Sequence, residues 1–360
     1  MQLQSALDKI NELTPGQESA VLRAKLRGLL RGYAKRWAND RFNVISVEDF
    51  VQSELYNPST KATSRTYRIG GKLDVLLEED GRVWLMDHKT TSEDIQDPGA
   101  AYWRQLTVEG QHHHYALLQH LNGVRVDGAI WDVIKKPGIS PKQVTKADTS
   151  AALASGKYFG DALSLEDAAY LREIGRETPS MYEARLANDC SEVRPEYYFQ
   201  RQRIARLDQG LLEYAEELWQ HSQDMLYSRR QACFPRNSGA CLEYGGACAF
   251  LGICSGYDEP TSANWKTREW VHPELPRGEC DGKDMLTNSR IRCFQTCRRK
   301  HYYKFELGIE RAEQEDREAL FFGTVMHEAL AIWFDRLRGQ NGTAIDEQAS
   351  AVCCATGSES

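Results

Sequence analysis

Two acidic residues and a lysine lie close together in YRIGGKLDVLLEEDGRVWLMDHKTT, residues 67–91. In an extended strand, Asp87 and Lys89 point to the same face because strand side chains alternate. Asp74, on a partner strand, brings a second carboxylate close by. Mg²⁺ and Mn²⁺ prefer such hard oxygen ligands. A metal held there would polarise a phosphate and lower the pKa of an attacking water, and the lysine would orient that water and offset the charge of the transition state.

The elements that must position these residues are two strands joined by a tight turn. Two apolar runs flank Glu79-Asp80-Gly81, and an Asp-Gly pair between such runs is a strong hairpin signal. Apolar residues recur at helical spacing in 20–40 and again in 101–121, and VDGAIWDVI predicts a further strand. A strand-rich block at about 43–89 with helices on both sides predicts an α/β fold, with a mixed central β-sheet flanked by helices.

The spacing of Asp87 and Lys89 does not establish this chemistry alone. D-x-K is a common tripeptide. On the spacing alone, a surface hairpin whose Asp and Lys side chains form exposed ion pairs is the more frequent explanation.

Three motifs in order favour the chemical interpretation. The sequence GGKLDVL, followed by WLMDHKTT and GQHHHY, resembles the RecB-like branch of the PD-(D/E)XK nuclease superfamily. In that branch an aspartate follows a Gly-rich strand start, a D-x-K-T motif comes next, and a Q-x-x-x-Y helix follows. The resemblance implies a restriction-endonuclease-like core. The catalytic residues that it implies are Asp74, Asp87, Lys89, Gln111 and Tyr115.

The same resemblance implies a Mg²⁺ or Mn²⁺ site. Asp74, Asp87 and the backbone carbonyl of His88 would be metal ligands, and Glu48 weakly matches an acidic position upstream. The neighbouring triplet 112–114, three histidines, does not predict a zinc site. Successive helix residues point about 100° apart and cannot converge on one ion.

A second group of residues suited to metal chemistry is the cysteines of CFPRNSGACLEYGGACAFLGIC, residues 233–254. The segment lacks the C-x₂-C pairs of most zinc ribbons. The spacing of Cys241, Cys248 and Cys254 resembles the C-terminal cysteine triplet of iron–sulfur nucleases, such as the AddB-type domain and the CRISPR-adaptation exonucleases. Their fourth cysteine lies in S-x-(L/I)-x-x-F-x-x-C, matched here by Cys297, although Arg298 replaces the usual proline. The resemblance implies a 4Fe-4S cluster in a helical, cysteine-ligated cap, with zinc on the same cysteines as the alternative.

The order of the motifs differs from that in the relatives, which begin with the Cys and His elements. Here FFGTVMHEAL follows the other motifs and matches an F-G-T-x-x-H element, so that His327 is by resemblance a further metal residue. A helix-packing histidine is the alternative. The chain reads as a circular permutation with one complete site, or as the end of one copy joined to the start of a second.

The predicted organisation has five parts. They are a nuclease core at 1–232, a cysteine segment at 233–254, a linker at 255–286, a permuted N-terminal element at 287–337 and a tail at 338–360. The predicted nucleic-acid contacts are Arg298, Arg299 and Lys300, a basic run that could equally be a solvated helix face.

Composition limits the partners and the location. The net charge of −7 argues against a general nucleic-acid coat protein but permits a local phosphate-binding surface. No apolar run reaches the roughly 18 residues of a membrane helix, and the N-terminus lacks the apolar core of a secretory signal. The ten cysteines then predict a reducing compartment, namely the cytoplasm of a bacterial or phage-infected cell.

The predicted function is therefore a metal-dependent DNA nuclease, expected to be an exonuclease in recombination, repair or phage DNA metabolism. Its substrate would be single-stranded DNA or duplex ends, with a helicase or recombinase as a partner and no membrane. A catalytically silent DNA-binding or scaffold module with the same fold and cluster is the alternative, and a zinc-bound RNA or protein-interaction module is a third.

Overall fold

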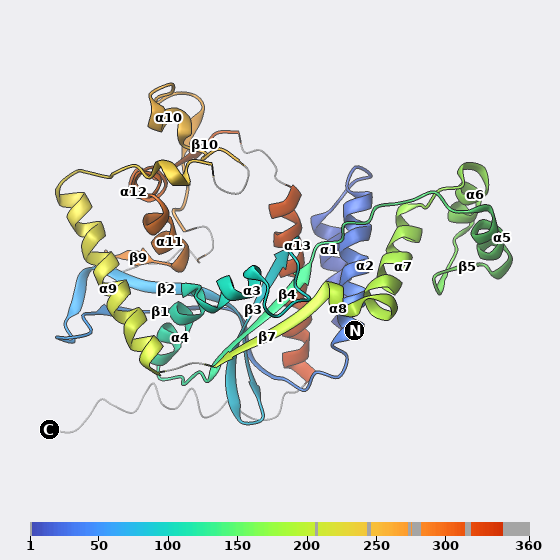
Figure 1. Cartoon of the computed structure of the whole chain (residues 1–360), viewed down its shortest axis with the longest axis horizontal. Helices are drawn as coiled ribbons and strands as arrows, with labels where there is room; N and C mark the ends of the chain where they lie inside the picture. The colour runs from blue at the N-terminus through green and yellow to red at the C-terminus, as the bar shows by residue number, and fades with distance from the viewer. Residues whose placement is uncertain are drawn as a thin grey trace.

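The computed structural model describes residues 2–205, 208–242, 246–272, 275, 282–313 and 318–340. Its centre is a mixed six-stranded sheet in which the path β1-β2-β3-β4-β7 is extended by β9 pairing with β2 (Figure 1). The strands of this sheet are β1 (Asn43–Tyr56), β2 (Thr63–Glu79), β3 (Arg82–Thr91), β4 (Gly128–Lys135), β7 (Phe199–Ala205) and β9 (Asp284–Leu286).

The predicted hairpin is the β2–β3 pair. Glu79 pairs with Arg82, and the two residues between them, Asp80 and Gly81, have φ of 52° and 72°. This left-handed backbone is what a two-residue hairpin turn needs. β3 and β4 run parallel, whereas β1–β2, β2–β3 and β4–β7 are antiparallel.

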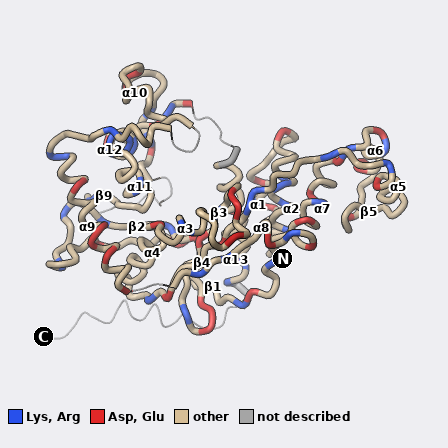
Figure 2. The backbone as a smooth tube through the Cα atoms, in the orientation of Figure 1, with Lys and Arg blue, Asp and Glu red and all other residues tan. Residues whose placement is uncertain are grey.

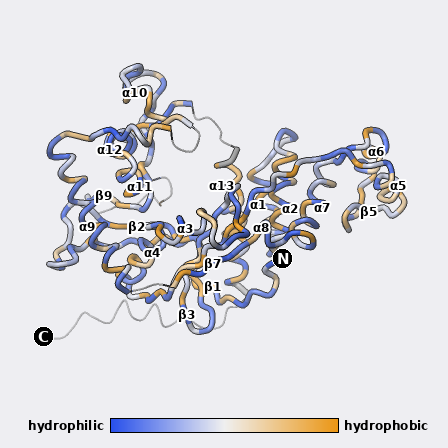
Figure 3. Tube along the Cα trace, viewed as in Figure 1, coloured by the Kyte–Doolittle hydropathy of each residue, from blue (hydrophilic) through white to orange (hydrophobic). Residues whose placement is uncertain are grey.

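Helices cover both faces of the sheet, because its strands carry apolar side chains on both sides. The core on one face contains buried residues of α1 (Gln2–Leu13), α2 (Ala20–Arg36), α7 (Pro179–Asn188) and α13 (Glu318–Gln340). The core on the other face contains those of α4 (Gly110–Leu121), α9 (Asp208–Arg230) and α11 (Asn288–Thr296). The hydrophobic stretches in Figure 3 follow these strands and helices. The predicted α/β fold is thus confirmed.

Two smaller parts project from this layered core (Figure 1). A side lobe has its own small core around Tyr158 and Leu171; its elements are α5 (Lys146–Ser155), β5 (Lys157–Tyr158), β6 (Asp161–Ala162) and α6 (Leu165–Ile174). A cap lies beyond the β9 edge, packed around Phe250, Trp265 and Tyr303. Its elements are α10 (Leu251–Ser255), β8 (Trp265–Thr267), α12 (Arg298–His301), the π-helix Tyr302–Glu306 and β10 (Ile309–Arg311). The remaining helices of the described residues are short: α3 (Ala101–Thr107), the π-helix Asp189–Val193, α8 (Pro195–Tyr198) and the 3-10 helix Ser238–Ala240.

The last described helix packs against the start of the chain. α13 contacts α1, α2, β1, β2 and β3, so the predicted C-terminal element belongs to the same compact unit as the hairpin. The predicted linker contains β8 and β9, and the predicted tail lies outside the described residues from 341 onward. Among the described helices, none is long and apolar enough to cross a bilayer.

The close packing of β4 against β7 and Trp84 gives a first prediction. A Cβ at Gly128 would lie 2.4 Å from the Ile204 carbonyl oxygen and 2.6 Å from the Trp84 ring. We expect Gly128→Ala to lower the free energy of unfolding in urea by about 1–3 kcal/mol, the usual effect of overpacking. Gly138→Ala is the control, because a Cβ there meets nothing within 4 Å. Equal losses in the two variants would contradict this packing.

Candidate active site

Asp74 and Asp87 lie side by side where β2 and β3 pair. Val75 is the register partner of Met86, so Asp74 and Asp87 occupy the next positions of the two antiparallel strands. The Asp74 carboxylate accepts a hydrogen bond of 2.9 Å from the His88 backbone N–H. The hairpin therefore holds two carboxylates at one point of the sheet.

Gln111 on α4 joins the lysine to the second carboxylate. Its Oε1 accepts a 2.7 Å hydrogen bond from Lys89 Nζ, and its Nε2 donates to Asp87 Oδ1 at 2.7 Å. Lys89 Nζ also lies 2.6 Å from Asp87 Oδ2. Tyr115, one helical turn later, has its hydroxyl 3.3 Å from Gln111 Nε2. A closed set of polar contacts thus joins the D-x-K strand to the Q-x-x-x-Y helix.

The glycine before Lys72 allows this helix to approach the strand. A Cβ at Gly71 would lie 2.6 Å from a Tyr115 ring carbon, which is closer than real Cβ atoms come. The Gly-rich strand start therefore has a packing role, since it lets Tyr115 lie flat against β2.

Burial and proximity change the proton affinities of these groups. Burial, together with the charge of Asp87, raises the pKa of Asp74 to about 7. Burial alone would lower the pKa of Lys89, but the Asp87 carboxylate outweighs it and holds that pKa above its ordinary value. Lys89 is therefore a cation at neutral pH. The pKa of Asp74 is raised although the nearby charge of Lys89 acts to lower it.

His327 on α13 reaches the same place from the C-terminal part of the chain. Its Nδ1 lies 3.6 Å from Asp74 Oδ2, and its ring centre lies 6.1 Å from that of His88. Burial lowers the pKa of His327, although the Asp87 carboxylate partly opposes the shift. A neutral imidazole keeps a lone pair for a metal. Glu48, whose charge also acts on His327, pairs with Lys72.

The donor set fits a hard divalent cation. Within the described residues, no group of three or more His, Cys, Asp and Glu side chains is placed to hold a metal ion by itself. Mg²⁺ does not need such a group, because it keeps several waters and commonly takes one or two carboxylates plus phosphate oxygens. Asp74 and Asp87 supply the carboxylates, and the His88 backbone and His327 lie beside them.

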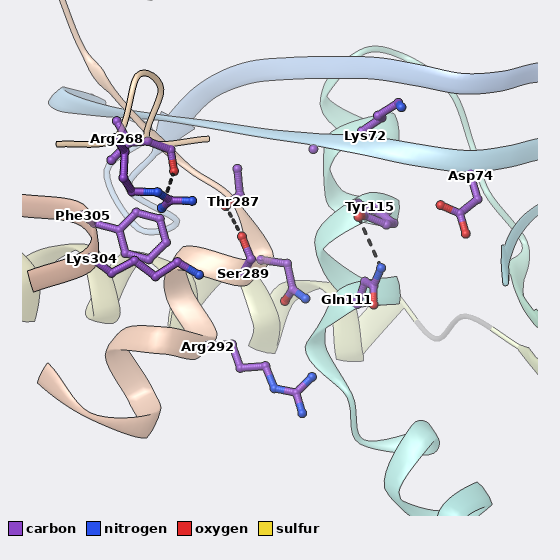
Figure 4. Close-up of a pocket in the computed structure, with 13 residues that line it drawn as sticks. Lys72, Asp74, Gln111, Tyr115, Arg268, Thr287, Ser289, Arg292, Lys304 and Phe305 are labelled. Carbon is purple, nitrogen blue, oxygen red and sulfur yellow. Dashed lines mark hydrogen bonds between the residues drawn. The ribbon is translucent and has the colours of Figure 1, made fainter. Parts of the chain in front are cut away.

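The site opens into a cleft of about 500 Å³ between the core and the cap. Figure 4 shows Lys72, Asp74, Gln111 and Tyr115 on the core side. The side chains facing them come from the β8 loop, α11 and the π-helix; they are Arg268, Thr287, Ser289, Arg292, Lys304 and Phe305. Basic groups therefore line a cleft that has the Asp74 carboxylate at one end.

The four predicted cysteines line a single pocket in the cap. Cys241, Cys248, Cys254 and Cys297 all contribute to it and are free thiols. The Asn237 backbone N–H points at the Cys297 sulfur at 3.5 Å, the kind of N–H···S contact that cluster sulfurs receive. Three cysteines of one segment and a fourth that follows β8 and β9 thus line one pocket.

The predicted nucleic-acid contacts do not lie in the cleft. Arg299 and Lys300 line the cysteine pocket, and Arg299 donates to the Phe234 carbonyl. Arg298 pairs with Asp224 on α9. Figure 2 shows the basic run on α12, at the cap. These three residues are placed near the cysteines, whereas other cations line the cleft.

The sequence interpretation missed several cleft residues, although some had a signal. Lys72 stands two positions before Asp74 and so shares its strand face, and Lys304 follows Lys300 by one helical turn. Arg268 had no recognisable signal. Within the histidine triplet, the buried His114 ring is hydrogen-bonded to the Gly70 carbonyl and the Tyr214 hydroxyl.

The paired carboxylates give a second prediction, for metal binding without DNA. We expect Asp87→Asn to weaken Mn²⁺ binding, measured by calorimetry, at least about tenfold, because a ligand oxygen is lost. Glu78→Gln on β2 is the control, since Glu78 pairs with Val83 near the turn of the hairpin, away from Asp74 and Asp87. Equal Mn²⁺ affinity of Asp87→Asn and the wild type would exclude Asp87 as a ligand.

Comparison with known proteins agrees with this geometry. The family model of the PD-(D/E)XK nuclease superfamily matches residues 2–255 and 285–358. Neither the curated proteins nor the solved structures contain a match. The matched residues are most of the chain and include the hairpin, the Gln111 helix and the His327 helix. The chain belongs to the PD-(D/E)XK nuclease superfamily.

Proposed function

We propose that the chain is a Mg²⁺- or Mn²⁺-dependent deoxyribonuclease, acting as an exonuclease, with one complete site per chain. The observation that carries the proposal is the closed set formed by Asp87, Lys89 and Gln111 beside Asp74. Membership of a nuclease superfamily supports phosphodiester hydrolysis, and the basic cleft supports a polyanionic substrate.

In the proposed reaction, each residue of the site would have a separate role. Asp74, Asp87, the His88 carbonyl and His327 would hold a divalent cation, which would supply Lewis-acid activation of water and phosphate. Lys89 would orient the attacking water and offset negative charge at the phosphorus. The water oxygen would bond to phosphorus as the water gives up a proton to solvent, the P–O ester bond would break, and the leaving oxygen would take up a proton from solvent. Gln111 holds Lys89 and Asp87 at a fixed separation, and Tyr115 steadies Gln111.

The cleft suggests how DNA approaches. Arg268, Arg292 and Lys304 line it together with Asp74, and there they would contact phosphates. At about 500 Å³, it suits an extended strand or a frayed end better than an intact duplex. We therefore propose single-stranded DNA or duplex ends as the substrate. The proposed setting is recombination, repair or phage DNA metabolism, with a helicase or recombinase as partner.

We also propose a 4Fe-4S cluster on Cys241, Cys248, Cys254 and Cys297. Their common pocket supports it, and so do the cations of Arg299 and Lys300 beside them, which would offset thiolate charge. The cluster would join the segment 233–254 to α11 and α12 and so hold the cap together.

The chain order is explained best by a circular permutation within the RecB-like, AddB-type branch. α13 packs on the first helix of the same chain, and β9 pairs with β2. The proposed parts keep the boundaries 1–232, 233–254, 255–286, 287–337 and 338–360. In a permuted chain, the element at 287–337, which begins the domain in relatives, follows the core. The junction lies near the pocket that the four cysteines line.

Cleavage of end-labelled single-stranded and duplex DNA tests the proposed function. We expect cleavage with Mn²⁺ or Mg²⁺, none with EDTA, and a loss of about 10²–10³-fold in kcat for Lys89→Met, because its charge acts on the transition state. Lys157→Met is the matched control, since Lys157 is exposed on the side lobe.

The results of these cleavage assays distinguish the proposed nuclease from a catalytically silent DNA-binding module. Cleavage that resists EDTA, or that Lys89→Met leaves intact, would contradict the proposal. DNA retention without cleavage by the folded wild type would indicate the silent binding module instead.

Metal analysis of anaerobically purified protein tests the cluster. We expect a brown protein with about four iron atoms per chain, and loss of both the colour and the iron in Cys254→Ser. Cys233→Ser is the control, because Cys233 is exposed and lies outside the cysteine pocket. If the protein contains stoichiometric zinc and no iron, the four cysteines form a zinc site and the proposed cluster is wrong.

A further inference from the structure

A row of charged and polar side chains crosses the sheet directly beside the proposed metal site. His88 on β3 is the register partner of Asp132 on β4, and Asp132 is the partner of Arg201 on β7. His88 Nδ1 lies 2.9 Å from Asp132 Oδ2, and Arg201 Nε donates to Asp132 Oδ1 at 2.9 Å. Three neighbouring strands are thus joined by side-chain contacts as well as by their backbones.

The row is anchored from α2 and from the segment after it. The Tyr33 hydroxyl donates a hydrogen bond to Asp132 Oδ2 at 2.5 Å, and it accepts one from Arg201 Nη2 at 2.9 Å. Arg201 Nη1 binds Asp40 at 2.6 Å, and its guanidinium lies 3.9 Å from the centre of the Trp37 ring. Every oxygen of Asp132 is therefore used, and the group has one arrangement.

This arrangement is buried in apolar surroundings. Asp132 is 0% exposed and His88 is 2% exposed, and all of β4 is buried. Burial would raise the pKa of Asp132, but the charge of Arg201 and the hydrogen bond with His88 hold it well below its ordinary range. Replacement of buried ionic groups by apolar ones is often neutral or stabilising. Stability alone therefore does not explain an aspartate in this strand.

The row ends at the backbone that forms the metal site. The N–H of His88 donates to the Asp74 carboxylate, and that carboxylate lies 3.6 Å from Nδ1 of His327. The His88 ring itself packs on Phe334, with ring centres 5.1 Å apart, and meets the His327 ring edge-on at 6.1 Å. Asp132 fixes one end of this ring, so it also fixes the main chain between Asp87 and Lys89.

We propose that Asp132 is a positioning residue for the nuclease site: through the His88 side chain it holds the residue-88 backbone against Asp74 and His327. The inference rests on the proposed function, because it takes Asp74 and the His88 carbonyl as metal ligands. Asp132 contacts neither metal nor DNA, and its effect is to preorganise groups that do.

Mn²⁺ binding in the absence of DNA is the first readout. We expect Asp132→Asn to weaken Mn²⁺ binding about 10–100-fold, the usual effect of losing a partner that orients a ligand, and to lower kcat with little change in KM for DNA. His88→Phe keeps a ring against Phe334 but loses the contact with Asp132, and we expect it to give the same losses. Both variants break the same contact between His88 and Asp132. The double variant should therefore bind Mn²⁺ as tightly, and cleave with the same kcat, as either single variant.

Glu177→Gln is the matched control. Glu177 is also a buried carboxylate, bound by Arg185, Tyr158 and the Lys142 backbone N–H, but it lies beside the side lobe. The Glu177→Gln variant should have a lower melting temperature, as Asp132→Asn should, but its Mn²⁺ affinity and kcat should stay at wild-type values.

Unchanged Mn²⁺ affinity in folded Asp132→Asn overturns the inference, as does a double variant whose losses multiply. If Asp132→Asn does not fold, unchanged Mn²⁺ affinity in His88→Phe overturns it. If the wild type binds Mn²⁺ but does not cut DNA, the proposed function is wrong. The Mn²⁺ affinities of Asp132→Asn and His88→Phe then still decide whether this inference holds.

Discussion

The antiparallel pairing of β2 with β3 is the constraint on which the site depends. It brings Asp74 next to Asp87 and lets the His88 N–H bind the Asp74 carboxylate. Burial is the main reason that the pKa of Asp74 rises, and the nearby charge of Asp87 raises it further. The sheet therefore provides a place where a divalent cation would relieve an unfavourable interaction.

The other parts of the molecule hold groups against this pair. α4 carries Gln111 to Lys89 and Asp87, and Gly71 lets its Tyr115 lie on the strand. α13 brings His327 from the far end of the chain. The cap closes the opposite wall of the cleft with basic side chains, so chemistry and substrate binding come from segments distant in sequence.

Much of this could be predicted because the signals are local. Strand alternation placed Asp87 and Lys89 on one face, and the Asp80-Gly81 turn predicted the hairpin that aligns Asp74. The side-chain row was not predictable, because the partners of Asp132 come from other elements, although one aspartate in an apolar strand was a signal. The direction of the basic run on α12 depends on how α12 packs beside the cysteine segment, and no local pattern encodes that packing.

The central claim is that one chain builds one complete site from the hairpin and from α13. Mixing Asp87→Asn with His327→Ala tests it most directly, with each inactive variant assayed alone and the two assayed together for Mn²⁺-dependent DNA cleavage. The account predicts that the mixture stays inactive, because each chain keeps its own defect. Activity that appears on mixing would show that His327 of one molecule serves the hairpin of another, and would contradict the account.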